Sequence, residues 1–191
     1  MKIKIFKLSV IILLFSFISA GCQKDDIFEL DIGDENAVIL KEVNGIEFKF
    51  CLLNEQGEPS TIFDEGENFT FQFSIKNKTG ENLIFHDYSF YEDTDFFSVH
   101  NNTQNFGRPF ELLTGYLTSN EMRYIHDEMS SSFTCRWQEN RDKFFTMHGA
   151  FEGLNKMPLE NGKYITNFTH NFHFGNVETG KLTFKINFKI K

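Results

Sequence analysis

Cysteine is scarce in this sequence, with three among 191 residues. A dense disulfide framework, of the kind that holds many small secreted domains together, is therefore excluded. No CxxC, HxH or HExxH spacing occurs, and a zinc site needs three or four convergent ligands. The chain also lacks a GxSxG elbow, a P-loop and a GxGxxG stretch. We therefore expect no metal, no cofactor and no enzymatic activity.

The first apolar run, Leu8–Ser19, is too short to cross a bilayer, which takes about 20 residues. It follows Lys2, Lys4 and Lys7 and precedes small residues. It has no polar face, which an amphipathic helix packed on a core would show. A short basic stretch, an apolar run of about 12 residues and a small-residue cleavage site together predict a secretory signal peptide.

The residues after this run are small ones and then a cysteine, Ser19-Ala20-Gly21-Cys22. They resemble the lipobox of bacterial lipoproteins, which implies that Cys22 is lipidated and becomes the mature N-terminus. More than one acyl chain is needed to hold a protein stably on a membrane, and lipoprotein modification supplies them. Four further residues resemble the export tag of Bacteroidota surface lipoproteins: Gln23, Lys24, Asp25 and Asp26. The resemblance implies a lipoprotein of the outer membrane, displayed at the cell surface.

These features divide the chain into a signal peptide at residues 1–21, a lipidated acidic tether at 22–36 and one domain at 37–191. We expect the charged tether to be extended, because like charges repel one another. Removing the signal peptide leaves 16 basic against 27 acidic residues, a formal charge of −11. So acidic a surface repels phosphate backbones. We therefore expect a membrane partner, through the lipid, and a protein or glycan ligand, but no nucleic acid.

Strict alternation of apolar and polar residues predicts β-strands through most of the domain. Residues 68–76 and 181–191 alternate without a break, and 46–52 follow the hairpin signal Asn44-Gly45. The segment 168–174 also alternates, and shorter candidates are 82–85, 96–100, 110–113, 131–137 and 144–151. Helical spacing predicts one helix, over 119–129. Eight or nine short strands separated by turns favour an antiparallel β-sandwich.

Three stretches carry a resemblance to a known fold: "FDEGENFTFQFSIKN" at 63–77, the region of Trp137, and "PLENGKY" at 158–164. Together they resemble the immunoglobulin-like domains of Bacteroidota lipoproteins and, more distantly, the BsuPI-like domain of intracellular proteinase inhibitors. The resemblance implies an immunoglobulin-like sandwich over about residues 44–190. It also implies structural roles: Tyr164 as a corner residue that hydrogen-bonds back to the chain, and Trp137 as a central packing residue.

Cys51 and Cys135 remain once the lipobox has used Cys22. An exported protein permits disulfides, so the pair could form one. Alternation argues against it, because Cys51 faces away from its neighbours Phe50 and Leu52, whereas Cys135 shares a face with apolar residues. Buried free thiols are common core residues. Both alternatives stay open at this point, with the free thiols favoured.

An acidic and aromatic segment at residues 86–97 contains the candidate ligand residues Asp87, Tyr88, Tyr91, Asp93 and Asp95. Carboxylates two residues apart begin many calcium loops, although the glycine and distal glutamate of an EF-hand are absent. Aromatic rings with polar tips are typical of recognition surfaces and favour a protein or glycan contact. A solubilising loop between strands is the third and favoured interpretation.

The sequence is most consistent with a non-enzymatic binding or interaction module presented on the cell envelope. One alternative is a protease inhibitor, from the BsuPI-like resemblance. Another is an accessory subunit of an envelope or nutrient-uptake complex. We interpret Lys181, Lys185 and Lys189 on the last predicted strand as a solvated face that discourages pairing at a sheet edge.

Overall fold

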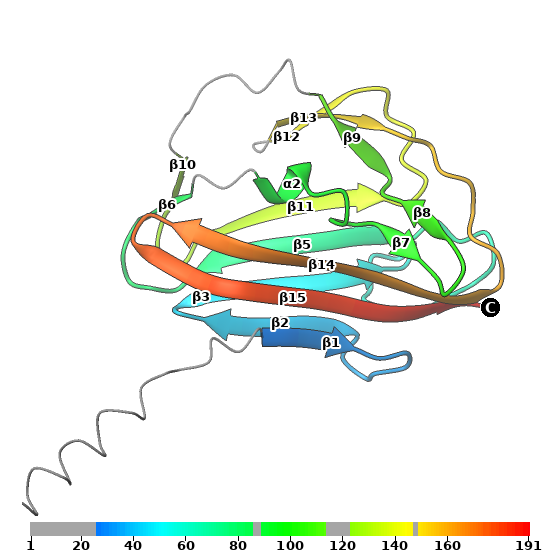
Figure 1. Ribbon diagram of the computed structural model, residues 1–191, viewed down its shortest axis with the longest axis horizontal. Helices are drawn as coiled ribbons and strands as arrows, with labels where there is room; N and C mark the ends of the chain where they lie inside the picture. Colours follow the sequence, from blue (N-terminus) through cyan, green and yellow to red (C-terminus); the bar gives the residue numbers. More distant parts are fainter. Residues whose placement is uncertain (1–25, 86–88, 114–122, 147–148) are drawn as a thin grey trace, which may run out of the picture.

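The computed structural model describes residues 26–85, 89–113, 123–146 and 149–191. Within them the chain forms fifteen strands and one short helix, α2 (Ser89–Glu92), arranged in three sheets (Figure 1). No helix among the described residues is long and apolar enough to span a membrane. The predicted signal peptide, Asp87 and Tyr88 lie outside the described residues, as do four residues of the lipidation and export motifs: Cys22, Gln23, Lys24 and Asp25.

The four-stranded sheet is antiparallel, in the order β11-β5-β3-β2. Its strands are β2 (Val38–Val43), β3 (Ile46–Leu53), β5 (Thr70–Asn77) and β11 (Ser130–Arg136). Asn44 and Gly45 join β2 to β3 with φ angles of 51° and 77°. Two left-handed residues give the turn whose twist suits a two-residue hairpin. This hairpin matches the signal that Asn44-Gly45 gives in the sequence.

The eight-stranded sheet is built around a long hairpin, β14 (Gly162–Phe174) with β15 (Val177–Ile190). Its other strands are β1 (Asp26–Leu30), β4 (Ile62–Phe63), β6 (Leu83–Phe85), β7 (Val99–His100), β8 (Asn105–Gly107) and β10 (Arg123–Ile125). Strands β1 and β4 both pair with β15 in parallel, whereas β7 pairs with β14 in antiparallel fashion. Thus β15 has neighbours along both of its edges.

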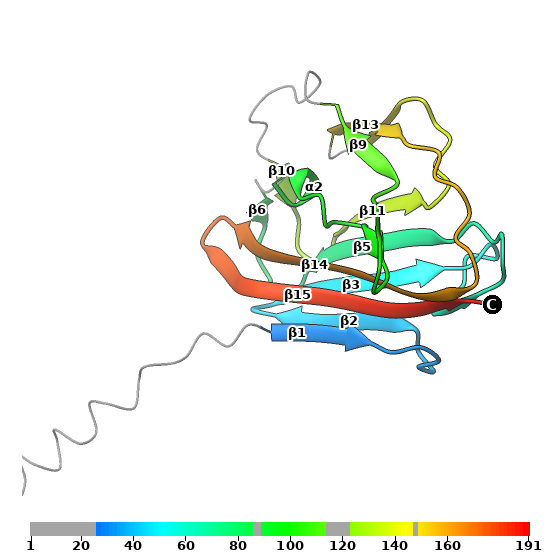
Figure 2. The same cartoon turned by 45° about the vertical axis from the view of Figure 1, so that its right-hand side comes forward.

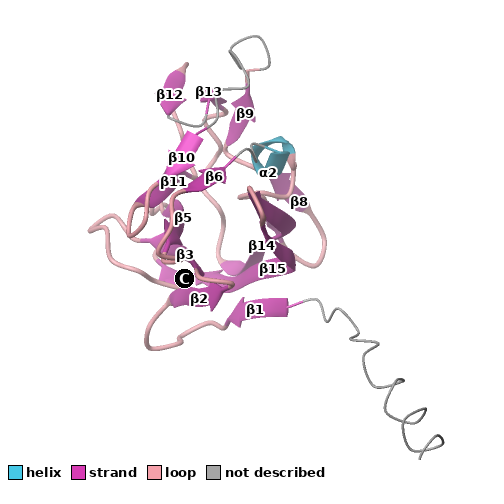
Figure 3. Cartoon of the chain, turned by 90° about the vertical axis from the view of Figure 1, so that its left-hand side faces the viewer, coloured by secondary structure: helices cyan, strands magenta, loops and turns pink. Residues whose placement is uncertain are grey.

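A three-stranded sheet completes the fold with β9 (Phe110–Leu112), β12 (Phe144–Thr146) and β13 (Gly149–Gly153). The turned view places this sheet above α2 and β11 (Figure 2). Viewed along the strands, the four-stranded sheet and the β14–β15 hairpin lie on opposite sides, and the three-stranded sheet lies over the gap between them (Figure 3). The architecture is an all-β sandwich with a third, smaller sheet.

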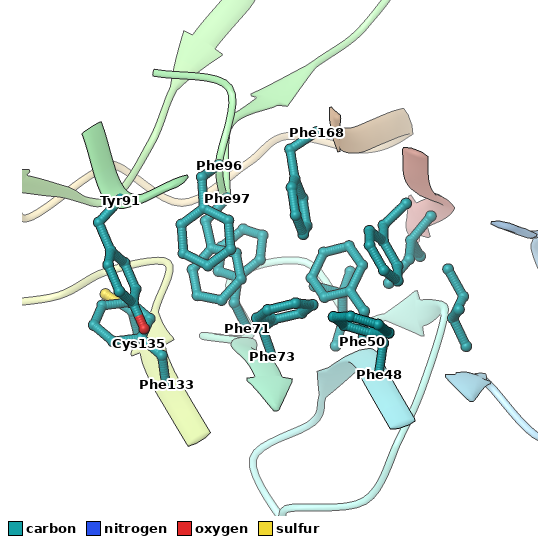
Figure 4. Close-up of a cluster of buried hydrophobic side chains, with 14 of the residues drawn as sticks. Phe48, Phe50, Phe71, Phe73, Tyr91, Phe96, Phe97, Phe133, Cys135 and Phe168 are labelled. Carbon is teal, nitrogen blue, oxygen red and sulfur yellow. The ribbon is translucent and has the colours of Figure 1, made fainter. Parts of the chain in front are cut away.

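Phenylalanine rings fill the space between the sheets (Figure 4). Phe48 on β3 lies 4.9 Å from Phe172 on β14, measured between ring centroids. Phe168 lies 5.3 Å from Phe73 and 5.1 Å from Phe184. These tilted, edge-to-face and stacked pairs each contribute about 0.5–1.5 kcal/mol beyond the burial of their area. The alternating residues of the sequence therefore meet face to face in one core.

The all-β sandwich predicted from the sequence is confirmed, but its details differ. The described residues form fifteen strands in place of the predicted eight or nine, because two-residue strands such as β4 and β7 pair with segments distant in the chain. The predicted helix over 119–129 is wrong where the chain is described, since Arg123–Ile125 form β10 against β6. Three apolar residues at helical spacing do not offset the cost of helix nucleation, whereas β6 offers backbone partners.

The stretch predicted as an extended tether also differs from expectation where it is described. Residues 26–30 form β1, which pairs with β15 from Asp26↔Leu182 to Leu30↔Ile186. Leu30 is buried, and the ring of Phe28 lies 5.4 Å from that of Phe184. Burial of these apolar side chains holds the acidic segment on the sheet. Only Gln23, Lys24 and Asp25 separate Cys22 from β1, a reach of about 14 Å at full extension.

Candidate functional site

Two hollows on the surface differ in how their polar side chains are used. One, of about 480 Å³, lies at the end of the sandwich around Glu55, Asp64 and Glu67. The carboxylate of Glu67 accepts the backbone N–H of Glu55 at 3.1 Å and that of Asp64 at 2.9 Å. These bonds occupy the carboxylate in holding two turns together. This end hollow is therefore explained by local structure.

The second hollow, of about 410 Å³, lies beside the β7–β8 turn on the outer face of the large sheet. We call it the β7–β8 hollow. Its walls come from the segment after α2, from β7 and β8, and from β14. The lining residues are Asp95, Ser98, His100, Asn101, Thr103, Gln104, Asn105 and Asn167.

Some of these residues build the turn itself. The side-chain oxygen of Asn101 accepts the backbone N–H groups of Thr103 and Gln104, each at 2.9 Å. The backbone N–H of Asn101 donates to the carbonyl of Gln104 at 2.9 Å. Asn105 accepts the N–H of Gly107 at 2.7 Å. Asparagine favours such turns because its side chain imitates a backbone acceptor. These bonds fix the rim of the hollow.

The other five lining side chains make no hydrogen bonds that build the turn. None of the five makes a side-chain hydrogen bond or ion pair with any residue that the structure describes: Asp95, Ser98, His100, Gln104 and Asn167. Ser98 is 5% exposed as a residue, and its hydroxyl is not among the buried side-chain atoms that lack a partner, so it is open to the hollow. The β7–β8 hollow therefore collects a carboxylate, a hydroxyl, an imidazole and two amides that are free to bind.

A half-buried arginine, Arg108, fixes the segment that carries Asp95 and Ser98. Nη1 of Arg108 donates to the carbonyl of Tyr91 at 2.7 Å and to that of Asp93 at 3.0 Å. Its guanidinium also lies 4.8 Å above the ring of Phe110. Burial lowers the pKa of Arg108, although nearby carboxylates oppose the change. Arg108 thus anchors the chain just before the hollow begins.

Two adjacent rings hold the other end of this segment in the core. Phe96 and Phe97 are both fully buried, with ring centroids 4.1 Å apart. Consecutive side chains of an extended strand would point to opposite faces. Phe97 has a φ of 62°, a left-handed conformation that is rare for a bulky residue. This strained turn lets both rings point inward and places Ser98, whose N–H donates to Asp95 O at 2.9 Å, at the hollow.

The structure separates the candidate residues of the acidic and aromatic segment. Tyr91 is wrong as a ligand contact: it is 2% exposed, and its ring lies 5.0 Å from that of Phe133 in the core. Its apolar ring gains more from burial than a surface position offers. Asp93 accepts the backbone N–H of Asp95 at 2.9 Å and so serves a turn. Asp95 alone of the described candidates lines the β7–β8 hollow.

The calcium interpretation gains no support from the described segment. No group of three or more His, Cys, Asp or Glu side chains among the described residues is placed to hold a metal ion. One oxygen of Asp93 is already engaged by the N–H of Asp95. Calcium takes six to eight oxygen ligands, and among the described residues these two carboxylates do not join a group of that kind.

Sequence reasoning missed Ser98, His100, Gln104 and Asn167. They meet because β7 pairs with β14, with His100 opposite Ile165. That pairing joins segments far apart in the chain, and a two-residue strand leaves no periodic signal. The run "NNTQN" at 101–105 is the one hint in the sequence, because its polar composition is typical of a turn that presents side chains.

Tyr164 and Trp137, to which the sequence resemblance assigns structural roles, both make contacts that fit those roles. The hydroxyl of Tyr164 donates to the carbonyl of Glu160, four residues upstream, at 2.8 Å. Trp137 is buried; its indole N–H donates to Met157 O at 2.9 Å, and its ring stacks on Phe69 at 6.0 Å. Both side chains thus join strands to connecting segments in the way that corner and packing residues do.

The two cysteines of the domain are both free and buried. Cys51 lies on the outward side of β3, where its sulfur contacts the Gln72 side-chain oxygen at 3.5 Å. Cys135 lies on the inward side of β11, next to the core. Burial raises the pKa of Cys51 to about 11 and that of Cys135 still further. The disulfide alternative is therefore wrong, because the thiols face opposite sides of one sheet.

No protein-family model and no curated protein matches the chain. A search of solved structures found similarity to ycdA of Bacillus subtilis, described as a lipoprotein, with 13% identity and a TM-score of 0.28. The match covers 78% of this chain and 38% of that one, so the chain spans well under half of the matched protein. The resemblances to Bacteroidota lipoproteins and to BsuPI-like domains therefore stay predictions.

Proposed function

We propose that this protein is a lipid-anchored protein of the cell envelope that binds a glycan in the β7–β8 hollow without transforming it. The observation that carries the proposal is the set of five polar side chains that line this hollow and have no described protein partner. These side chains line the hollow, where a ligand can replace the hydrogen bonds that water otherwise makes to them.

The chemistry of the five side chains suits a ligand rich in hydroxyl groups. The carboxylate of Asp95 accepts hydrogen bonds, and the amides of Gln104 and Asn167 both donate and accept. Ser98 and His100 also offer both roles. A sugar ring presents adjacent hydroxyls that each donate and accept, so it can satisfy such a set. A volume of about 410 Å³ lies within the usual range of small-ligand sites.

A lipid anchor on Cys22 would leave the β7–β8 hollow away from the membrane surface. Strand β1 begins opposite Leu182 of β15, whereas His100 lies beside Ile165, whose partner on β15 is Asn187. Five residues along a strand correspond to about 17 Å. A lipid on Cys22 would hold the start of β1 near the membrane, and the β7–β8 hollow lies farther along the sheet. Display at the cell surface is the part of the proposal that the export-tag resemblance supports.

Binding of purified protein to a panel of glycans tests the site. The mature chain with Cys22→Ser avoids detergent, and we expect it to bind at least one glycan of the panel. Ser98→Ala, Gln104→Ala and Asn167→Ala should each weaken that binding by about two- to tenfold, the worth of one hydrogen bond. Gln56→Ala in the end hollow is the matched control and should bind normally. A panel without any binding, or hollow variants that bind like the parent, would contradict the proposal.

Anchoring is tested in cells. Cys22→Ser should move the protein out of the detergent phase, because the only predicted membrane attachment is the lipid. Protease added to intact cells should remove the domain if it is displayed on the outside. Retention of Cys22→Ser in the membrane would exclude lipidation as the anchor. Resistance to protease until the outer membrane is broken would exclude surface display.

A further inference from the structure

We propose that the glycan is anionic and that it extends from the β7–β8 hollow across a row of lysines on the outer face of the β14–β15 hairpin. This inference rests on the proposed function and adds the chemical class of the ligand. The lysine row consists of Lys163 on β14 and of Lys181, Lys185 and Lys189 on β15.

The register of the hairpin places these side chains on one face. Lys163 is directly opposite Lys189, and Lys185 is directly opposite Asn167 of the hollow. Their inward neighbours, such as Phe168 and Phe188, are buried, so the lysines point outward. Positions four residues apart on a strand are separated by about 13 Å. The lysine row is therefore long and narrow, which suits an extended polymer better than a single small anion.

Three of the four lysines in the row have no counter-ion among the described residues. Lys185 pairs with Glu29 at 2.6 Å, but Lys163, Lys181 and Lys189 form no ion pair with any residue in the described part of the chain. Like charges directly opposite on a sheet are destabilising, as at Lys163 and Lys189. A chain with 27 acidic residues has ample carboxylates to neutralise this pair, yet none of the described ones is placed there. An external anion would supply the missing charge.

Protection of a sheet edge does not account for the lysines, although the sequence alone favours that role for Lys181, Lys185 and Lys189. In the structure β15 is flanked by β14 on one side and by β1 and β4 on the other. Strands with neighbours on both sides need no charged residues to prevent intermolecular pairing. What remains of that interpretation is a solvated, positively charged face on a fully paired strand.

The row and the hollow are continuous. His100 of the hollow lies beside Ile165, and Lys163 is two residues farther along β14, a distance of about 7 Å. A sugar held by Asn167 and His100 would thus have its neighbour next to the Lys163–Lys189 pair. Asp95 lies within the hollow, where it can accept hydroxyl hydrogens, away from the row.

Acidic residues border the row at the β1 side. Glu29 is used by Lys185, and the carboxylate of Asp31 accepts a hydrogen bond from Asn187 at 3.0 Å. These carboxylates limit the positively charged surface to a strip along the β14–β15 hairpin. An anionic lipid surface is the other occupant with this charge, but a flat membrane against this face would meet these carboxylates and cover the hollow. Charge and shape together therefore favour a polymer.

A matched pair of polymers tests the inference: polygalacturonate and its fully methyl-esterified, neutral form. We expect the mature Cys22→Ser chain to bind the charged polymer more tightly at low salt, and the difference to disappear near 1 M salt, where the screening length is about 3 Å. Lys163→Gln with Lys189→Gln should weaken binding of the charged polymer by about two- to fivefold per lysine and leave the neutral one unchanged. Lys41→Gln with Lys49→Gln, on the opposite sheet, removes the same two charges and is the control for net charge.

The polymer experiment can overturn the anionic ligand without overturning the proposed glycan site. Equal binding of both polymers, or unchanged binding by the lysine variant, would overturn the anionic ligand while the glycan site stands. Binding of neither polymer by a chain that binds neutral glycans of the panel would also overturn it. So would a lysine variant that loses binding only to vesicles rich in phosphatidylglycerol. A thermal midpoint no lower than that of the parent shows that the variant is folded.

Discussion

The ion pair of Glu139 and Arg141 offers the sharpest test of how this fold is stabilised. The Glu139 side chain is 3% exposed, and Arg141 donates to both of its oxygens, from Nε at 2.6 Å and from Nη2 at 2.5 Å. Burial alone would raise the pKa of Glu139, but the hydrogen bonds and charge of Arg141 outweigh it, so that the pKa is lowered. Arg141→Gln would leave a buried carboxylate without its partner.

The expected cost follows from the geometry. Breaking a fully buried ion pair costs about 3–5 kcal/mol. Half of the Arg141 side chain is exposed, so solvent already weakens the pair and we expect about 2–3 kcal/mol. For a domain of this size each kcal/mol lowers the thermal midpoint by about 2–4 °C. Arg141→Gln should therefore lower the midpoint by about 4–12 °C at neutral pH.

The stability difference between Arg141→Gln and the parent should depend on pH in a defined direction. In the parent the lowered pKa stabilises the fold above about pH 4.3, the unfolded value, and this part is lost as pH falls through the folded pKa. In Arg141→Gln burial dominates and raises the pKa of Glu139 above its unfolded value. Protonation then relieves the buried charge, so the gap between variant and parent should shrink as the pH falls from 8 to 4.5.

Thermal unfolding followed by near-UV circular dichroism across this pH range measures both effects. Lys76→Gln, which breaks the more exposed pair with Glu128, is the control and should cost at most about 1 kcal/mol. The reasoning is refuted if Arg141→Gln costs no more than this control. A gap that widens on acidification would refute the assignment to Glu139.

Three further changes test particular contacts. In Gly153→Ala the added Cβ would lie 2.6 and 2.7 Å from two backbone carbonyl oxygens, so we expect a loss of about 1–3 kcal/mol in urea unfolding, whereas Gly162→Ala has room and should be tolerated. Tyr164→Phe removes the bond to the Glu160 carbonyl and should lower the unfolding free energy by about 1 kcal/mol. Phe97→Gly should be no less stable than Phe97→Ala, because its φ of 62° favours glycine; a clear reversal would argue against backbone strain there.

The sandwich could be predicted because its longest strands are amphipathic in isolation. Residues 69–75 alternate so regularly that no helix could bury one set of them, and the structure buries Phe71, Phe73 and Ile75 as the period requires. Alternation likewise indicates that Cys51 and Cys135 belong to opposite faces, and both thiols are free in the structure. These are properties of single segments, which a sequence displays directly.

The hollow could not be predicted because it depends on partners distant in the chain. Asn167 is an ordinary outward residue of β14 until β7 brings His100 beside the same strand. Tyr91 failed as a ligand residue for the converse reason: its polar tip is visible in the sequence, but the core that receives its ring is not. Composition indicates a binding surface, and only pairing between strands locates it.

Residues of the β14–β15 hairpin alternate between inward positions, which stabilise the core, and outward positions, which form the proposed site. Tyr164, Phe168 and Phe188 point inward, where loss of a large ring costs about 3–5 kcal/mol. Lys163 and Asn167 occupy the positions between them and point outward. Substitutions at the outward positions of this hairpin can therefore change which ligand is bound with little effect on the stability of the fold. The proposed site thus lies on the most extensively hydrogen-bonded pair of strands, which keeps its groups in place before any ligand arrives.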